Sequence, residues 1–409
     1  MILLTLEQVE ADLGSSEAVE TYLRAKQAPL EYCFPARLEE MLVLESTIAR
    51  HPQDGAASYL LGNLLYDRRR HDEAIAAWEH AAFSNPSHAT LWRNLGIAYF
   101  NIRKDATRAL EAFERAHKAD PQDGRILYER DQLWKRTGTA PERRLEELLH
   151  FPAIVLLRDD LSVELATLYN QVGRPEDALE LMLHRKFQPW EGGEGLTLAQ
   201  YVRAHLLLGQ RALGSGNGAA ALVQFQSALQ VPGNLGEARH LLAGHSDIDY
   251  WLGVAHESLR EETKAAEWWH RATRQTRDSQ PGISEMSYWS ALAHRRLGEE
   301  AEAVALFRAV LDYSGELEAS EPNIPYFATS LPAMLLFEED LRRRKTIEAR
   351  YLRAQAMAGM GRTSEAADLL DELLTMDRNH AGAADLLRRL NPSGGKATGD
   401  STRESRPLP

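Results

Sequence analysis

Residues 55–86 read GAASYLLGNLLYDRRRHDEAIAAWEHAAFSNP, and this stretch decides the fold. On each side of the basic turn 68–71, apolar side chains recur at the spacing of one face of an α-helix. The first helix carries Tyr59, Leu61, Leu64 and Leu65 on that face, and the second carries Ala74, Ile75, Trp78 and Ala81. Pro86 ends the second helix, because proline cannot continue the hydrogen-bonded ladder. The stretch therefore predicts a helical hairpin.

The residues that close this hairpin recur along the chain. A small residue is followed twelve or thirteen positions later by an alanine, and four positions after that by a bulky apolar residue. The sets are Gly62, Ala74 and Trp78; Gly96, Ala109 and Phe113; Ala166, Ala178 and Met182; Gly209, Ala221 and Phe225; Gly253, Ala265 and Trp269; Ala291, Ala303 and Phe307; and Ala354, Ala366 and Leu370. One period between residues 55 and 390 predicts stacked helical hairpins, an architecture typical of binding proteins.

Residues 88–121, HATLWRNLGIAYFNIRKDATRALEAFERAHKADP, resemble the 34-residue tetratricopeptide repeat. The matching positions are Trp92, Leu95, Gly96, Tyr99, Ala109, Phe113, Ala116 and Pro121. The resemblance implies an all-α solenoid of about eight to ten hairpins wound into a right-handed superhelix. We expect a helical cap over residues 1–35, regular repeats over 36–150, degenerate repeats over 151–390 and a disordered tail over 391–409. A degenerate hairpin is expected between Arg125 and His150.

Bulk composition excludes several classes of function. Lys and Arg number 47 against 60 Asp and Glu, a net charge of −13, which disfavours a nucleic acid or an anionic membrane surface as partner. The single cysteine, Cys33, allows neither an internal disulfide nor a cysteine metal site. The first residues lack a basic signal-peptide region, and no apolar run reaches the length of a membrane span. We therefore expect a cytoplasmic protein without cofactor, metal or catalytic residues.

Three segments interrupt the period: residues 184–198, 231–248 and 314–332. We name them the first, second and third inserts, and inserts in solenoids often carry the binding face. The first contains Trp190, Glu191 and Glu194 among three glycines that permit close backbone approach. These residues could bind a sugar hydroxyl, a cation or a basic peptide. The alternative is a purely structural role, in which the segment is a surface loop and the Trp190 side chain packs between helices.

The other two inserts also allow more than one interpretation. His240, His245, Asp247 and Asp249 could ligate a metal, but their spacing fits no known signature. Capping of a helix that starts at Tyr250, by Asp247 or Asp249, is favoured. In the third insert, Tyr326 and Phe327 are expected to pack onto the solenoid. Ser330 lacks the sequence context of a nucleophile.

The groove formed by the first helices supplies a further candidate surface. Asn63 and Asn94, with Arg93 and Arg125 near them, occupy positions at which some tetratricopeptide domains clamp an acidic peptide tail. Tyr59 and Glu129 stand where such a clamp needs basic side chains, which argues against acidic tails. An aromatic and amide-lined groove still suits a peptide. The groove residues expected to bind a partner are Tyr59, Asn63, Trp92 and Asn94, with Tyr66 and Tyr99 beside them.

Several further stretches resemble the C-terminal half of a bacterial family of long, poorly characterised proteins. They are residues 33–45, 59–78, 91–101, 187–195, 247–253 and 325–341, and the resemblance covers residues 30–390. In that family a sugar-mutarotase-like β-sandwich region precedes the tetratricopeptide array. No alternating strand pattern precedes residue 35 here. Three explanations of this difference from the family therefore stay open: a stand-alone relative, a split gene or a truncated product.

These observations predict a non-catalytic scaffold that binds a protein, with a sugar-active β-sandwich protein or domain as the implied partner. The predicted docking surface combines Trp190, Glu191, Glu194, Asp247, Tyr326 and Phe327 with the four groove residues. The alternative is direct carbohydrate binding or glycan chemistry in a pocket of the inserts, with Glu191 and Glu194 as acid and base. A third hypothesis is a remnant whose first hairpin once covered a lost domain.

Overall fold

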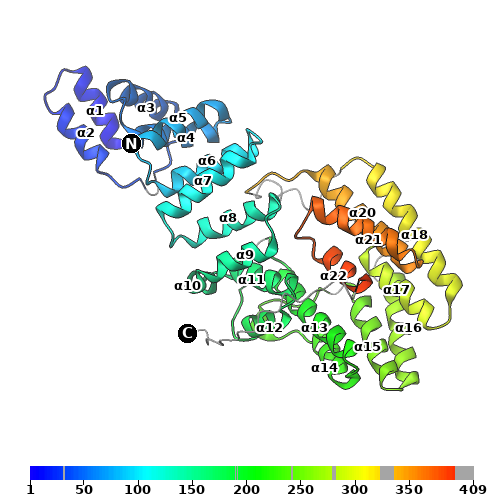
Figure 1. Cartoon of the computed structure of the whole chain (residues 1–409). Helices are drawn as coiled ribbons and strands as arrows, with labels where there is room; N and C mark the ends of the chain where they lie inside the picture. The colour runs from blue at the N-terminus through cyan, green and yellow to red at the C-terminus, as the bar shows by residue number, and fades with distance from the viewer. Residues whose placement is uncertain are drawn as a thin grey trace. The chain divides into compact units, whose positions relative to one another are not determined.

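The computed structural model describes residues 1–30, 33–188, 190, 192–240, 243–278, 282–322 and 336–391 (Figure 1). Every regular element in these ranges is helical, which confirms the all-α prediction. None of the helices in these ranges is long and apolar enough to cross a membrane. The tail beyond Asn391 and most of the third insert lie outside the described residues.

The described chain divides into two compact units. Unit 1 contains residues 1–137 and 336–338, and unit 2 contains residues 138–322 and 339–391. The boundaries expected at residues 35, 150 and 390 rest on repeat regularity, a criterion different from compactness, and they remain predictions.

Unit 1 is built from helices α1 to α8. Their bounds are α1 (Ile2–Asp12), α2 (Ala18–Lys26), α3 (Leu38–Arg50), α4 (Gly55–Asp67), α5 (His71–Ser84), α6 (Ala89–Asn101), α7 (Ala106–Ala119) and α8 (Gly124–Arg136). Helices α4 and α5 pack as one hairpin, and α6 and α7 as the next. Three aspartates cap helices in this array by accepting backbone N–H groups: Asp54 on α4, Asp105 on α7 and Asp123 on α8.

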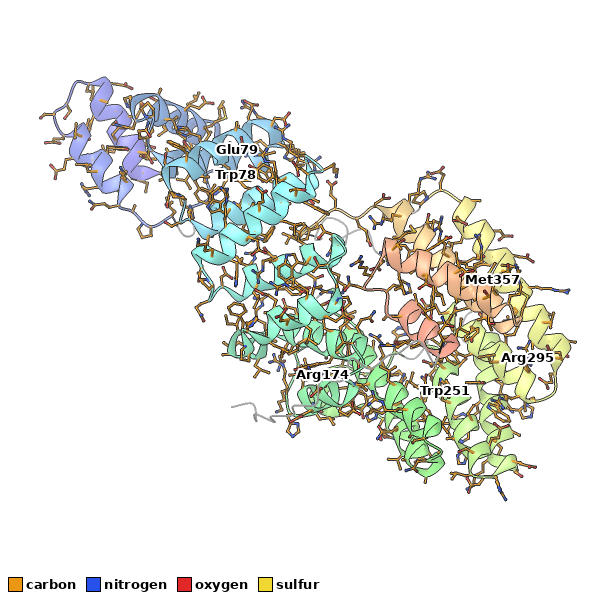
Figure 2. All side chains as sticks on the ribbon, viewed as in Figure 1. Trp78, Glu79, Arg174, Trp251, Arg295 and Met357 are labelled. Atoms are coloured by element: carbon orange, nitrogen blue, oxygen red, sulfur yellow. The ribbon has the colours of Figure 1, made fainter. Side chains whose placement is uncertain are left out.

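The small-to-bulky interlock predicted from sequence closes these hairpins. A Cβ atom on Gly62 would lie 2.4 Å from the indole of Trp78, and one on Gly96 would lie 2.5 Å from the ring of Phe113. Trp78 is buried, while its neighbour Glu79 stays at the surface of α5 and accepts a hydrogen bond from Tyr99 (Figure 2). Only glycine leaves room for the ring at such a crossing.

Unit 2 repeats the same plan with longer and less regular helices. They are α9 (Pro141–Leu149), α10 (Pro152–Leu157), α11 (Asp159–Gln171), α12 (Pro175–Leu183), α13 (Leu196–Gly214), α14 (Gly218–Leu229), the 3₁₀ turn η1 (Gly233–Leu235), α15 (Ser246–Ser258), α16 (Glu262–Asp278), α17 (Glu285–Arg296), α18 (Glu300–Ala319), α20 (Leu341–Gly359), α21 (Thr363–Met376) and α22 (Ala381–Leu390). Hairpins form between α11 and α12, α13 and α14, α15 and α16, α17 and α18, and α20 and α21.

Two local expectations need correction. Helix α15 begins at Ser246 rather than at Tyr250, so Asp247 and Asp249 lie in its first turn and do not cap it. Helix α18 continues to Ala319, so the first residues of the third insert are helical. The hairpin expected between Arg125 and His150 spans the boundary between the two units, with α8 packed on α7 in unit 1 and α9 on α11 in unit 2, and it remains a prediction.

A short segment that follows the third insert completes the core of unit 1. Phe337 is 1 % exposed and packs against Phe100 and Phe113. Asn101 donates to the carbonyl of Leu336 at 2.8 Å and accepts from the N–H of Glu338 at 2.9 Å. Residues 336–338 therefore contribute to the packing of unit 1.

Candidate functional site

The first helices of the hairpins in unit 2 share a surface that the C-terminal helix covers. Helix α22 lies beside α11, α13 and α20 (Figure 1). Asp385 of α22 accepts two hydrogen bonds from Arg203 of α13, at 2.8 and 2.9 Å. Arg388 donates to the carbonyl of Gln171 at 2.9 Å, and Arg389 lies 4.7 Å from the ring of Trp289. Unit 2 therefore fills with its own helix the kind of surface that solenoids use for binding.

Electrostatics favour this docked arrangement. Burial by itself would raise the pKa of Asp385, but the guanidinium groups of Arg203 and Arg388 outweigh it and hold that pKa below its usual range. Asn379, just before α22, accepts a hydrogen bond from the fully buried Arg144 at 2.6 Å. His380 packs against the ring of Tyr351 and caps the helix by accepting from the N–H of Ala383.

In unit 1 the corresponding surface carries a polar network. Asn94 of α6 donates to the side-chain oxygen of Asn63 of α4 at 3.2 Å. Arg93 forms a two-point ion pair with Glu129 of α8, at 2.5 and 2.6 Å, and Arg125 adds a third hydrogen bond to that carboxylate. The positive charges near the two asparagines are thus already paired, as the position of Glu129 in the sequence indicates. The network does not suit an acidic peptide tail.

Two of the aromatic groove residues line a different hollow. Trp92 lines a separate hollow of about 520 Å³ with residues of α5 and α7, and Arg115 lies 4.6 Å above its ring. Tyr99 lines the same hollow, and Tyr59 packs edge-on against His88. The structure brings Asn63 and Asn94 together, whereas Trp92 and Tyr99 line a hollow whose lining includes neither asparagine.

In unit 2 the first and second inserts fold against each other. The amide of Asn234 donates to the carbonyls of Met182 and Arg185, at 2.8 and 2.7 Å. The backbone N–H of Phe187 donates in return to the carbonyl of Asn234 at 2.8 Å. Gly236 has φ +72°, and a Cβ there would lie 2.3 Å from the oxygen of Phe187. Asn234 and Gly236 therefore hold together two loops that lie about fifty residues apart in the sequence.

A carboxylate of the second insert serves as the cap of helix α13. Gly195 precedes that helix with φ 77°. It has no side chain that could accept hydrogen bonds from the N–H groups at the start of the helix. Glu237 accepts hydrogen bonds from the N–H groups of Gly195, at 2.7 Å, and of Leu198. A negative charge at a helix N-terminus is favourable, because unpaired N–H groups and the helix dipole both point there. The cap fixes the first insert to the second at its other end.

The loop that carries Trp190 is compact around glycine. The indole lies on Gly193, where a Cβ atom would approach it to 2.0 Å. The N–H of Gly193 donates to the carbonyl of Trp190 at 3.0 Å, and the N–H of Gly192 donates to the carboxylate of Glu194 at 2.9 Å. Glycines at positions 192 and 193 thus give the partly exposed Trp190 a defined place.

The two inserts line an open cavity of about 1020 Å³, which we name the insert cavity. Its lining is mainly apolar and includes Leu198, Val202, Leu235 and Ile248. The predicted residues Trp190, Glu194 and Asp247 all line it. Its other polar and glycine lining residues are Gln188, Gly193, Gly195, Thr197, Glu237, Arg239, His240 and Gly244.

Asp247 is the most desolvated carboxylate of the insert cavity. One oxygen accepts from the N–H of Ile248 at 2.8 Å. Burial is the main cause that raises the pKa of Asp247. The hydrogen bond from Ile248 and the charges of His245 and Arg239 act in the opposite direction and lower it. The neighbouring Asp249 instead pairs with His245 at 3.3 Å inside the core. Within the described ranges, no three His, Cys, Asp or Glu side chains gather as a metal site.

Part of the predicted docking surface thus comes together. Trp190, Glu194 and Asp247 meet at the insert cavity, whereas Glu191, Tyr326 and Phe327 lie outside the described residues. Asn234, Glu237 and Arg239 were missed by sequence reasoning. The glycine at 236 marks a turn, but no local pattern indicates that these side chains reach the first insert.

Comparison with known proteins supports the repeat assignment. The family model of the tetratricopeptide repeat matches residues 43–82, 59–124 and 269–317. YrrB, described as a TPR protein with an unusual peptide-binding site, is similar at 18 % identity with a TM-score of 0.26. That match covers 57 % of this chain and 93 % of YrrB.

Two further solved structures are similar over more of the chain. A tetratricopeptide repeat protein from Parabacteroides merdae matches at 14 % identity and a TM-score of 0.32, covering 85 % of this chain and 98 % of its own. The structure of Naa15/Naa10 bound to HypK-THB matches at 13 % identity and a TM-score of 0.42, covering 96 % of this chain and 60 % of that one. Over residues 43–124 and 269–317, where the family model matches, the chain therefore carries tetratricopeptide repeats.

Proposed function

We propose that this protein is a non-catalytic scaffold that binds a protein partner, and that the insert cavity is its main docking site. The observation that carries the proposal is the meeting of two separate inserts in one cavity, lined by Trp190, Glu194 and Asp247. Loops held by a rigid scaffold commonly carry function. The solenoid surface of unit 2 is filled by α22, which favours a site at the inserts.

The partner we propose is a sugar-active β-sandwich protein or domain supplied by another chain. Support comes from the resemblance of residues 30–390 to the repeat half of a family in which such a region accompanies the array. A partly exposed tryptophan above an apolar cavity is a typical anchor point for a protein partner. Asn63 and Asn94 of unit 1 are proposed as a second, polar contact.

The test places a photo-crosslinking amino acid at position 194 of the full chain and identifies the protein that it captures in cells. The captured protein is then purified, and its Kd is measured for wild type and for Trp190→Ala, Asp247→Asn and Phe83→Ala. Phe83 is 83 % exposed on α5 and serves as the aromatic control. We expect Trp190→Ala to weaken binding about thirtyfold, as at an interface anchor, with Phe83→Ala unchanged.

Binding that survives both cavity substitutions but is lost in Asn63→Ala/Asn94→Ala would move the docking site to unit 1. Binding that all variants retain would refute both surfaces. Circular dichroism and thermal melting of each variant separate a lost contact from a lost fold.

A second candidate function is direct carbohydrate binding. The observation that favours it is the flat Trp190 side chain beside the polar groups of Glu194, Gln188 and Thr197, because sugars present apolar faces and hydroxyl rims. Titration with a panel of neutral and uronic-acid sugars, followed by calorimetry, tests it. Heat that appears for one sugar in wild type and disappears in Trp190→Ala would support this function over protein docking.

A further inference from the structure

The described lining of the insert cavity has an excess of negative charge. Glu194, Glu237 and Asp247 each contribute a carboxylate, and Arg239 is the one Lys or Arg side chain among the described lining residues. The guanidinium of Arg239 already donates to the carbonyl of Ala228 at 2.8 Å. With a net charge of −13 on the chain, an anionic ligand would meet repulsion both at a distance and at the site.

The three carboxylates are held in place by backbone N–H groups rather than by cationic side chains. Glu237 accepts from Gly195 and Leu198, Glu194 from Gly192, and Asp247 from Ile248. Backbone amides orient these carboxylates. Arg239 and His245 lower the pKa of Asp247, but three carboxylates against one arginine leave the described lining net negative. A cation from outside would therefore be attracted to the cavity.

The negative region extends past the cavity along unit 2. Glu285, in the first turn of α17, has its pKa raised by burial first, then by the charges of Glu348 and Asp247. Asp247 lines the cavity and its charge also acts on Glu285, so a cation bound at Asp247 would reduce the repulsion between these two carboxylates.

The apolar part of the cavity restricts what kind of cation fits. Leu198, Leu235 and Ile248 are nearly fully buried beneath it, and Trp190 presents an indole at its edge. A hydrated metal ion gains nothing from such a wall. Lysine and arginine instead place an apolar stem along apolar surface and a charge at its end, and their heads also bind aromatic faces.

We propose that the insert cavity takes a peptide segment of the partner in which a lysine or arginine is flanked by apolar residues. The charged head lies between Asp247 and Glu194, and the apolar neighbours contact Trp190 and the leucine wall. This inference rests on the proposed function, because it names the chemistry of the partner at the same site.

A random dodecapeptide display library provides an unbiased probe. The library is selected on the full-length wild-type chain and counter-selected on the Trp190→Ala/Asp247→Asn variant. Enriched peptides are then synthesised, and each is made again with the basic residue replaced by norleucine or by glutamate. Fluorescence anisotropy gives their Kd values for wild type, Glu194→Gln, Asp247→Asn and Glu302→Gln. Glu302 is an exposed glutamate of α18 and controls for a change of net charge.

We expect enrichment of Lys or Arg next to Leu, Ile, Met or Phe. Asp247→Asn should weaken the parent peptide about tenfold and leave the norleucine peptide unchanged, because only the parent has a charge to pair. Glu302→Gln should have no effect. Binding of the parent peptide should also weaken on going from 0.05 to about 0.5 M salt, since part of the attraction is screened.

Two results would overturn the inference in different ways. Enriched peptides that are acidic or uncharged, yet depend on Trp190, would refute the cationic class and leave the docking site intact. A selection without any enrichment that depends on Trp190 and Asp247 would refute the docking site itself and the proposed function with it.

Discussion

Units 1 and 2 are built from the same kind of helical hairpin but use the surface of their first helices differently. In unit 1 the hairpins α4–α5 and α6–α7 are closed by Gly62 with Trp78 and by Gly96 with Phe113, and the first helices share a polar network. In unit 2 the hairpins are interrupted by inserts, and α22 covers the first helices. Regular repeats are thus sufficient for a core. The inserts produce the insert cavity, because their extra residues extend from one hairpin to the next and contact each other.

The largest expected difference between the units concerns buried arginines. Arg144→Met in unit 2 removes a buried guanidinium that donates to Glu164 at 2.6 Å and to Asn379 at 2.6 Å. Loss of one partner of a buried ion pair costs about 3–5 kcal/mol. Arg93→Met in unit 1 should cost roughly 1 kcal/mol, because Arg125 still pairs with Glu129. Urea unfolding followed by hydrogen exchange in each unit measures both. Equal losses would show that the second arginine compensates nothing.

The next prediction asks whether the helix crossings are equally tight in both units. Gly209→Ala places a Cβ 2.2 Å from the ring of Phe225, and Gly62→Ala places one 2.4 Å from Trp78. Overpacking of this kind costs about 1–3 kcal/mol. Gly214→Ala, at the end of the same helix α13, meets no atom within 4 Å and should be neutral or stabilising by about 0.5 kcal/mol. A Gly209→Ala protein as stable as Gly214→Ala would refute the crossing argument.

A smaller effect should distinguish α22 from unit 1 as the pH falls. Burial is the main cause that lowers the pKa of His380, and its Nδ1 must stay unprotonated to cap α22. When folding lowers the pKa of a histidine, the histidine contributes its full stability at pH values above its unfolded-state pKa of about 6.5. This stability is lost as the pH falls through the folded-state pKa. Asp377 and Asp385 oppose the shift, and Arg203 adds to it.

Hydrogen exchange of α22 between pH 7.5 and 5 tests this, after correction for the intrinsic exchange rates. We expect α22 to lose about 1 kcal/mol of protection, the value of a helix cap. His380→Asn keeps a capping side chain without this titration and should flatten the profile. An unchanged wild-type slope in His380→Asn would assign the effect to another group.

The smallest expected effect concerns the junction of the inserts. Glu237→Gln keeps one acceptor for the N–H groups of α13 but removes the negative charge at its N-terminus. Such a charge contributes about 0.3–1 kcal/mol. The peptide 184–198 should exchange faster, while Glu302→Gln leaves it unchanged. A faster exchange confined to α4 and α5 in unit 1 would contradict a local role.

Most of the fold could be predicted from the sequence, because a hairpin is specified by residues within one period. The crossings at Gly62, Gly96, Gly209 and Gly253 all follow the predicted set, with the bulky partner in contact each time. The start of α15 was misplaced by four residues, because an aspartate in the first turn resembles a cap in sequence. Helix ends depend on only one or two hydrogen bonds and are weakly encoded.

The candidate site was predictable only in part. Trp190 and Asp247 stand out as an aromatic and an acidic residue in non-repeat sequence, and both line the insert cavity. Trp92 and Asn94 lie two positions apart on α6 and point in different directions: Trp92 lines a hollow with residues of α5 and α7, while Asn94 contacts Asn63.

The sequence alone therefore determined the repeat, the helices and the aromatic-on-glycine crossings, since each depends on residues within about 35 positions of one another. The tertiary structure decided the rest. It joined Asn234 to Met182, Glu237 to Gly195 and Asp385 to Arg203, across 52, 42 and 182 residues. Local periodicity cannot encode such contacts, because they arise only after the stacked hairpins have brought distant loops and the last helix to the same place.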